Sequence, residues 1–173
     1  MSLRKILIHP DRRLTKKCAQ ITSFDSNLKD LADDMFETMY DAPGIGLAAP
    51  QIGVLFQIFV MDCASKEEKP NPLVFINPVI NWTSPESFTH NEGCLSIPDQ
   101  TADVERPAEV EVRYLDENGA SQSLIATGLL ATCVQHEIDH LNGVLFIDHI
   151  SRLKRDMIMR RILKEMRQST SRK

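Results

Sequence analysis

The stretch His136-Glu137-Ile138-Asp139-His140 decides how the rest of the sequence is interpreted. Residues four apart on a helix lie on one face about 6 Å from each other, so His136 and His140 can reach a single metal ion. Glu137 lies about 100° around the helix from His136, where its carboxylate can approach the metal without ligating it. This is the His-Glu-x-x-His pattern of metal-dependent hydrolases, in which the glutamate is the general base. The alternative is two exposed histidines on an amphipathic helix, but composition gives only about 0.01 chance occurrences of the pattern in 173 residues.

A catalytic metal site needs a third protein ligand and one position that stays open for water. The downstream candidate, His149, follows Gly143 and the segment 144–147, which we expect to form a strand. It is favoured as a surface or core histidine, although it would be the third ligand of an endopeptidase. The upstream candidate, Cys94, follows a glycine in the polar segment 91–98, which ends in proline and is expected to form a tight loop. We therefore predict that Cys94 is the third ligand.

Cys133 is a further candidate, because it lies seven residues before His140 and almost in helical phase with it. With Cys94 and the two histidines it would make a closed, structural site, as in a non-catalytic module. The four cysteines are widely spaced in a chain without a secretory signal. Each thiol is therefore expected to be a small core residue or a ligand rather than part of a disulfide.

Three segments resemble the peptide deformylase family. The family carries Gly-φ-Gly-φ-Ala-Ala-x-Gln, Glu-Gly-Cys-φ-Ser and Gln-His-Glu-φ-Asp-His, where φ is apolar. The chain has them in this order at Gly44–Gln51, Glu92–Ser96 and Gln135–His140. The resemblance also includes residues 33–40 and 143–146, so it spans most of the chain.

The resemblance implies that the chain hydrolyses the N-formyl group from the N-terminal formyl-methionine of newly made peptides and releases formate, a step of protein biosynthesis. It implies that Cys94, His136 and His140 hold one divalent metal ion that activates a water molecule as the nucleophile. Glu137 would be the general acid and base. One thiolate and two imidazoles suit Zn²⁺, Fe²⁺, Co²⁺ or Ni²⁺, and the resemblance implies Fe²⁺ as the native ion.

The resemblance also assigns roles around the metal. The Gln51 side-chain amide and the Leu95 backbone N–H are expected to donate hydrogen bonds to the oxyanion. The residues expected to bind the substrate, with a pocket for an unbranched side chain such as methionine, are Ile45, Gly46, Leu129, Thr132 and Cys133. Thr132 and His90 stand where apolar residues are expected in relatives, so they bear on side-chain preference.

Two charged residues near these motifs are expected to support the ligands. Glu92 is predicted to pair with Arg106 and so brace the cysteine segment. Asp139 faces away from the metal by helical phase and is predicted to have a structural partner.

Length and composition fit one domain that remains in the cytoplasm. At 173 residues and 19.6 kDa, we expect a single catalytic domain over residues 1–168 and a frayed tail over residues 169–173. No apolar run approaches the roughly 18 residues of a membrane span. The N-terminus has the features of neither a secretory signal nor a transit peptide, so we expect a cytoplasmic location and no membrane contact.

Charge is unevenly distributed along the chain. Residues 152–173 contain nine Lys/Arg and two acidic residues and so carry +7, which leaves −11 on residues 1–151 for a net charge of −4. This basic end suggests a polyanionic partner, while the alternative is a solvated helix face. So short a basic segment predicts no direct DNA binding, but it suits contact between the C-terminal helix and the ribosome.

The pattern of apolar residues and turns predicts an α+β fold. A helix is expected over residues 27–40 with Ser26 as its N-cap, and Asn118-Gly119 is a hairpin signal. The other expected elements are strands at 57–62, 73–76, 109–115 and 122–125 and helices at 128–142 and about 152–166. The last helix is expected to turn one apolar face inward, made of Met159, Ile162, Leu163 and Met166. The order favours mostly antiparallel sheets packed around a central metal-binding helix, with an N-terminal helix and a C-terminal helix.

Overall fold

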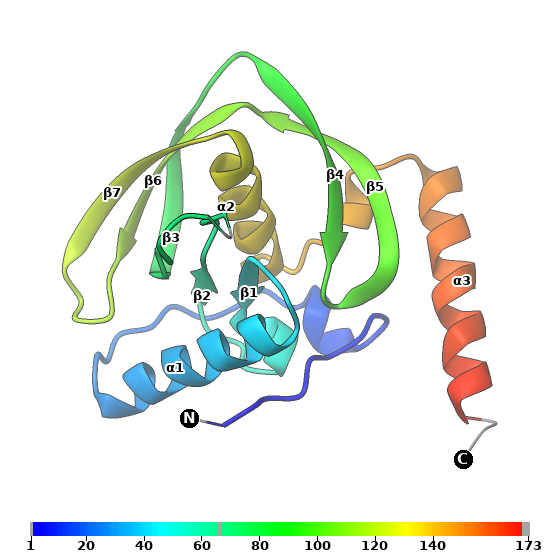
Figure 1. Ribbon diagram of the computed structural model, residues 1–173, viewed down its shortest axis with the longest axis horizontal. Coiled ribbons are helices and arrows are strands. Elements are labelled where there is room, and N and C mark those ends of the chain that lie inside the picture. Colours follow the sequence, from blue (N-terminus) through cyan, green and yellow to red (C-terminus); the bar gives the residue numbers. More distant parts are fainter. Residues whose placement is uncertain (1, 66, 171–173) are drawn as a thin grey trace.

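The computed structural model describes residues 2–65 and 67–170. The fold is α+β, as predicted. Helix α2 (Gly128–Leu141) lies between a five-stranded sheet and a two-stranded sheet, and α1 (Ser26–Asp41) lies along one end of the molecule (Figure 1). Helix α3 (Arg152–Thr170) lies at the opposite edge from the large sheet, beyond the two-stranded sheet. None of the helices in this described part has the length and apolar character that crossing a bilayer requires.

Both sheets are antiparallel throughout. The larger has the order β1-β2-β3-β6-β7, and β4 pairs with β5 in the smaller. The strands are β1 (Gly46–Ala48), β2 (Ile58–Met61), β3 (Leu73–Thr83), β4 (Ser87–Cys94), β5 (Ile97–Pro107), β6 (Glu109–Leu115) and β7 (Ser121–Thr127). The described residues also contain three 3₁₀-helices: η1 (Arg12–Thr15), η2 (Ala49–Ile52) and η3 (Phe146–Asp148).

Helix α2 is buried on two sides, one of which carries apolar residues and the other polar residues. On the apolar side, Ala131 and Val134 share a core with the large sheet, where the rings of Phe59 and Phe75 stack 4.5 Å apart. On the other side, polar residues are buried as well. These are Gln135, His136, Glu137 and His140. Because burying polar groups is unfavourable unless they find partners, this second side is where a functional site is expected.

The predicted hairpin and helix positions are confirmed, with differences at the ends. Gly119 adopts φ +80 in the turn between β6 and β7, the conformation for which glycine is suited. The N-cap of α1 is Asp25 and not Ser26, because the Asp25 carboxylate accepts the Leu28 N–H at 3.2 Å. Helix α3 continues to Thr170, beyond the expected end, and residues 171–173 of the predicted frayed tail lie outside the described residues.

Of two predictions about the C-terminal part, one was wrong and the other was right for only two of its four residues. Residues 144–147 do not form a strand; they lead into η3, where Phe146 and Ile147 are buried in an apolar cluster. On α3, Ile158 and Ile162 enter the core and Met159 packs against it, so Met159 and Ile162 lie where they were predicted. Leu163 and Met166, expected on the buried face, are 40% and 42% exposed. The helix contacts the body through a narrower stripe than its composition indicated.

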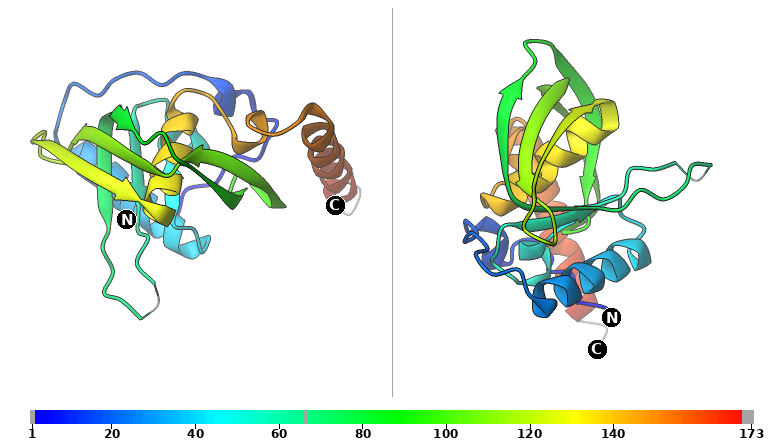
Figure 2. Two further views of the ribbon diagram at one scale, coloured as in Figure 1. Left: turned by 90° about the horizontal axis from the view of Figure 1, so that it is seen from above. Right: turned by 90° about the vertical axis from the view of Figure 1, so that its left-hand side faces the viewer.

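Figure 2 shows that the connection between β2 and β3 extends away from the body. It begins at Asp62 and Cys63, directly after β2. The base of this connection therefore lies next to the sheet edge that β1 forms beside α2.

Candidate metal centre

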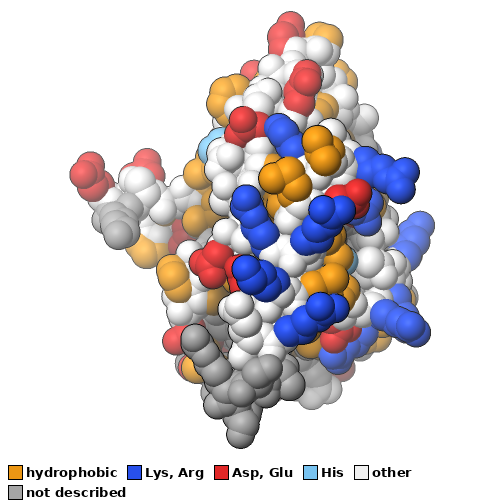
Figure 3. All heavy atoms as spheres, turned by 90° about the vertical axis from the view of Figure 1, so that its right-hand side faces the viewer, with side chains coloured by type: hydrophobic (Ala, Val, Ile, Leu, Met, Phe, Trp, Pro, Cys, Tyr) orange, Lys and Arg blue, Asp and Glu red, His pale blue; other side chains and the backbone are white. Residues whose placement is uncertain are grey.

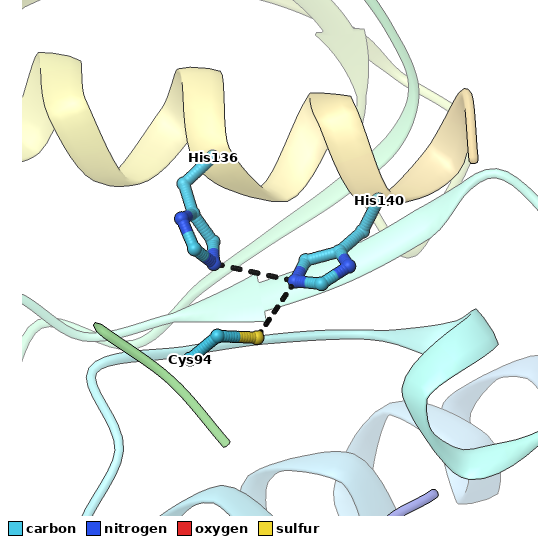
Figure 4. Close-up of side chains that lie close together, drawn as sticks. All are labelled: Cys94, His136 and His140. Atoms are coloured by element: carbon cyan, nitrogen blue, oxygen red, sulfur yellow. Dashed lines mark hydrogen bonds between the residues drawn. The ribbon is translucent and has the colours of Figure 1, made fainter. Parts of the chain in front are cut away.

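Cys94, His136 and His140, called the metal centre below, bring one sulfur and two ring nitrogens together (Figure 4). Their ligand atoms all lie within 4.8 Å of one another. The His140 Nε2 is 3.3 Å from the Cys94 sulfur and 3.2 Å from the His136 Nε2. A thiolate and two imidazoles at such spacing are a donor set for a divalent transition metal, and three protein ligands leave a position open. The residues therefore fit a catalytic metal ion.

Cys94 reaches the metal centre from the end of a strand, and not from a tight loop as predicted. In β4, Gly93 pairs with Thr101 of β5, but the next pair joins Cys94 to Ile97. This shift in register closes the hairpin tightly and turns the chain at Leu95. The pairing of two strands thereby fixes the cysteine, while the helical repeat of α2 fixes both histidines.

A buried ion-pair network holds the histidines in place. Glu92 accepts from the His136 Nδ1 at 2.9 Å, which leaves the Nε2 of that ring directed at the metal centre. Arg106 donates to Glu92 at 2.6 and 3.0 Å, so the predicted pair is confirmed. Asp139 also has the partner that was predicted, because it accepts from Arg106 at 2.8 Å. His149 lies 2.7 Å from the same Asp139 oxygen and is not among the three clustered ligands. The endopeptidase alternative thus lacks its ligand.

The two buried carboxyl groups beside the metal centre, Glu92 and Glu137, have pKa values shifted in opposite directions. Burial would raise the pKa of Glu92, but hydrogen bonds from His136 and Arg106 lower it to about 2, so it is a carboxylate. Burial raises the pKa of Glu137 to about 7, and its Oε2 has no hydrogen-bond partner among the described residues. Burial also lowers the pKa of His140, which favours the neutral ring that a metal ligand must have. Glu137 is thus the group suited to exchange protons near neutral pH.

Gln51 is oriented by the backbone of its own turn. Its Oε1 accepts from the Ala48 N–H at 2.8 Å, so its amide nitrogen faces the other way. That nitrogen lies 3.2 Å from the Ser96 hydroxyl and 3.5 Å from the Cys94 sulfur. Gln51 and the neighbouring Leu95 therefore adjoin the metal centre, as their predicted role requires.

A cavity of about 530 Å³ opens onto the metal centre. The substrate-binding residues predicted from the sequence all line it: Ile45, Gly46, Leu129, Thr132 and Cys133. A methyl group on Gly46 would collide with the Glu137 carboxylate, so glycine is required there. The Thr132 hydroxyl donates to the Gly128 carbonyl at 3.4 Å, which turns its polarity toward the helix backbone. His90 lines the same cavity.

The alternative in which Cys133 is a fourth ligand is not supported. Its sulfur lies 3.8 Å from the Ile45 carbonyl and is not part of the metal centre. Sequence reasoning gave no role to Ser96, which is fully buried and holds the Gln51 amide. Its place in the motif Glu92–Ser96 was the available signal, since a serine with no exposure must have a hydrogen-bond partner.

Three donors that would leave a bound metal ion one position for water lie next to a carboxyl group able to exchange protons, and this defines the class of protein as a metal-dependent hydrolase. Residues 3–156 match the polypeptide deformylase family. The chain belongs to this family, which is metal-dependent.

The similarity to individual relatives covers nearly whole chains. Peptide deformylase of Rhizobium meliloti (strain 1021) is 55% identical over 164 residues, which are 95% of this chain and 94% of the relative. That of Brucella suis biovar 1 (strain 1330) is 53% identical over 173 residues, 100% of this chain and 99% of the relative. The solved structure of a peptide deformylase from Legionella pneumophila superposes with a TM-score of 0.90 at 44% identity, covering 99% of both chains. The Ehrlichia chaffeensis enzyme in complex with actinonin gives 0.91 at 40% identity, covering 95% of this chain and 98% of that one.

Proposed function

We propose that the metal centre and Glu137 together hydrolyse the formyl amide at the N-terminus of newly made peptides, the reaction of the family to which the chain belongs. The chain is a hydrolase that releases formate and leaves a free N-terminus. The observation that carries the assignment of residues is the convergence of the three donors beside one buried carboxyl group with a pKa of about 7.

The metal centre would hold one divalent cation, for which we propose Fe²⁺ as the native ion. Zn²⁺, Ni²⁺ and Co²⁺ fit the same donors, because all of these ions can be bound by one thiolate and two imidazoles. When bound, such an ion supplies Lewis acidity and lowers the pKa of water toward neutrality. Glu92 and Arg106 hold the His136 ring in the orientation in which its Nε2 would bind this ion.

Glu137 takes the proton of the attacking water as a carboxylate and gives it to the departing amine as a carboxylic acid. A pKa of about 7 makes both forms available at neutral pH, and burial causes it. The Gln51 amide nitrogen and the Leu95 N–H would donate to the oxyanion that forms on the substrate. The Ala48 N–H already holds the carbonyl oxygen of Gln51, so the amide nitrogen faces the metal centre and would exchange its long contact with the Cys94 sulfur for the oxyanion.

The substrate would bind as an added strand along β1. This strand is at the edge of the large sheet, so one side of its backbone is unpaired within the sheet. The first side chain would then enter the cavity between Ile45, Leu129 and Cys133. With the Thr132 hydroxyl bound to the helix backbone, the cavity suits an apolar, unbranched side chain such as methionine.

Formate release from a formyl-methionyl peptide tests this assignment. Glu137→Gln keeps the shape of the side chain but removes its titration, so it should retain the metal ion and lose about 10²-fold to 10⁴-fold in kcat. Glu105→Gln, on an exposed position of β5, is the matched control and should behave as the parent enzyme. Turnover by Glu137→Gln within tenfold of the parent would reject the role of Glu137.

We also propose that α3 docks on the ribosome, in the cytoplasm where nascent chains are made. Figure 3, which faces α3, shows Lys and Arg side chains over much of this surface. The exposed cations on the helix include Arg152, Lys154, Arg160, Arg161 and Lys164. Their separation from the cavity on the other side of β4 and β5 would leave the metal centre accessible to a peptide.

Cosedimentation with ribosomes tests the docking. Reversing Arg160 and Arg161 to glutamate should abolish sedimentation that the parent shows at low salt, because counterion release drives such contacts. Reversing Lys16 and Lys17, which are exposed near η1, changes the net charge equally and should have little effect. Equal sedimentation of the parent and the α3 variant would overturn the proposal.

A further inference from the structure

Two cysteines of one apolar cluster lie near the Ile45 carbonyl, Cys133 through its sulfur and Cys63 through the preceding residue, Asp62. The Ile45 carbonyl accepts the Asp62 N–H at 2.9 Å and lies 3.8 Å from the Cys133 sulfur. Cys63 follows Asp62 directly, so the end of β2 brings it to Cys133 of α2. Both belong to one apolar cluster, in which Cys63 packs against the buried residues. The cysteines are far apart in sequence but adjacent in the fold.

The electrostatics of the pair distinguish the two sulfurs. A hydrogen bond from Cys133 lowers the pKa of Cys63, although burial and the charge of Asp62 oppose the change. The same hydrogen bond, together with burial, raises the pKa of Cys133 well above its usual value. Cys63 is therefore the sulfur that becomes a thiolate and Cys133 is the thiol that stabilises it.

Both thiols can be reached from solvent-connected cavities. Cys63 is partly exposed and lines a second cavity, of about 440 Å³, at the base of the β2–β3 connection. Cys133 lines the cavity that opens onto the metal centre. Leu129 lines both cavities, so the two lie next to each other.

We propose that Cys63 and Cys133 are a peroxide-responsive pair that closes to a disulfide in the wall of the substrate cavity. The Cys63 thiolate attacks a peroxide oxygen, the O–O bond breaks, and the leaving hydroxide takes a proton to become water. The Cys133 thiol then attacks the sulfur of the Cys63 sulfenic acid and expels a second water. Each sulfur is oxidised by one electron and the peroxide is reduced by two. A thiol-reducing system restores the pair.

Closure acts on catalysis through the neighbours of Cys133. Its sulfur is in the space that a side chain on Gly46 would enter, together with the Glu137 carboxylate. Drawing this sulfur toward Cys63 would move the cavity wall beside Glu137, the group that transfers protons. Because a displacement of about 1 Å in an active site can cost up to 10²-fold in rate, the oxidised enzyme should be about tenfold less active.

The other two cysteines provide the contrast that a test needs. Cys18 lies in the same apolar cluster, but burial raises the pKa of its thiol to about 11. It should be inert toward peroxide. Cys94 belongs to the metal centre, and its oxidation would remove a ligand and release the ion, unlike closure of the Cys63–Cys133 pair.

Peroxide treatment of the nickel-loaded enzyme tests the proposal, since Ni²⁺ is not oxidised as Fe²⁺ is. After free thiols are blocked, mass spectrometry should show the loss of two hydrogen atoms and a peptide pair joined through Cys63 and Cys133. Formate release should fall about tenfold, with the nickel retained, and should recover with dithiothreitol.

Cys63→Ser should have the activity of the parent before treatment and should show no loss that dithiothreitol reverses. Cys18→Ser is the matched control and should respond as the parent does. Absence of the joined peptides would overturn the proposal, and so would a reversible loss in Cys63→Ser equal to that of the parent. The peptide analysis does not depend on the roles assigned to the metal centre, so the two proposals can fail separately.

Discussion

Helices α2 and α3 both carry polar residues, but they do so in opposite ways. On α2 the polar side chains are buried, and His136 is held by Glu92, which is itself held by Arg106. On α3 the cations are exposed, and the helix is attached to the body by Ile158 and Ile162. The comparison teaches that burial converts polar residues into fixed, pKa-shifted groups fit for chemistry, while exposure leaves them as a charged surface. Substitutions on α2 and its supports should therefore change catalysis, whereas those on α3 should not.

The largest effect among the supports of α2 is expected from Gly46→Ala. The new methyl group would collide with Glu137 and stand 2.9 Å from the Cys133 sulfur, in space that β1 and α2 leave only for a hydrogen atom. We expect kcat/KM for formate release to fall about 10²-fold. Metal content, measured in parallel, should be unchanged. An activity within threefold of the parent would show that Glu137 can move freely and that the close contact has no catalytic role.

A smaller effect is expected from Arg106→Ala, which removes the partner of Glu92 and Asp139. Loss of such support for a metal ligand costs about 10-fold to 100-fold in metal affinity, which competition with a chelator measures. Arg113→Ala, at an exposed position of β6, is the control. Unchanged affinity in Arg106→Ala would mean that α2 alone orients His136.

The smallest effect on catalysis is expected on α3. Ile162→Ala removes a side chain that is 2% exposed and should lower the free energy of unfolding by about 2–4 kcal/mol, because it leaves a cavity. Leu163→Ala, at a position 40% exposed, should cost well under half as much. Thermal unfolding compares the two, and formate release by both should match the parent. Loss of turnover in folded Ile162→Ala would contradict the separation of the two helices.

The two helices also differ in how far the sequence predicted them. The positions of the donors on α2 follow from the helical repeat, and the three segments around Gly44, Cys94 and His136 predicted which residues meet. On α3 the sequence predicted two of the contacting residues, Met159 and Ile162, but missed Ile158, because four apolar residues among many cations do not define which of them is buried. Which residues of so short an apolar stripe are buried depends on the surface that the helix packs against, here Leu145 and Phe146.

Other features depended on tertiary structure in the same way. Strand β5 alternates exposed and buried residues, but β4 is mostly exposed and its one buried residue is Glu92, so no apolar alternation marked the segment around Cys94 as a strand. The proximity of Cys63 to Cys133 depends on the pairing of β1 with β2, which no local pattern reports. Local periodicity thus predicted the ligands, while register and packing determined what surrounds them.

The most direct test of the metal centre is X-ray absorption at the metal edge of the enzyme reconstituted with zinc. The structure predicts one sulfur donor at about 2.3 Å and two imidazole nitrogens at about 2.0–2.1 Å, with a remaining donor that comes from solvent. Cys94→Ser should lose the sulfur signal. A spectrum without sulfur in the parent enzyme, or one with two sulfur donors, would contradict the account.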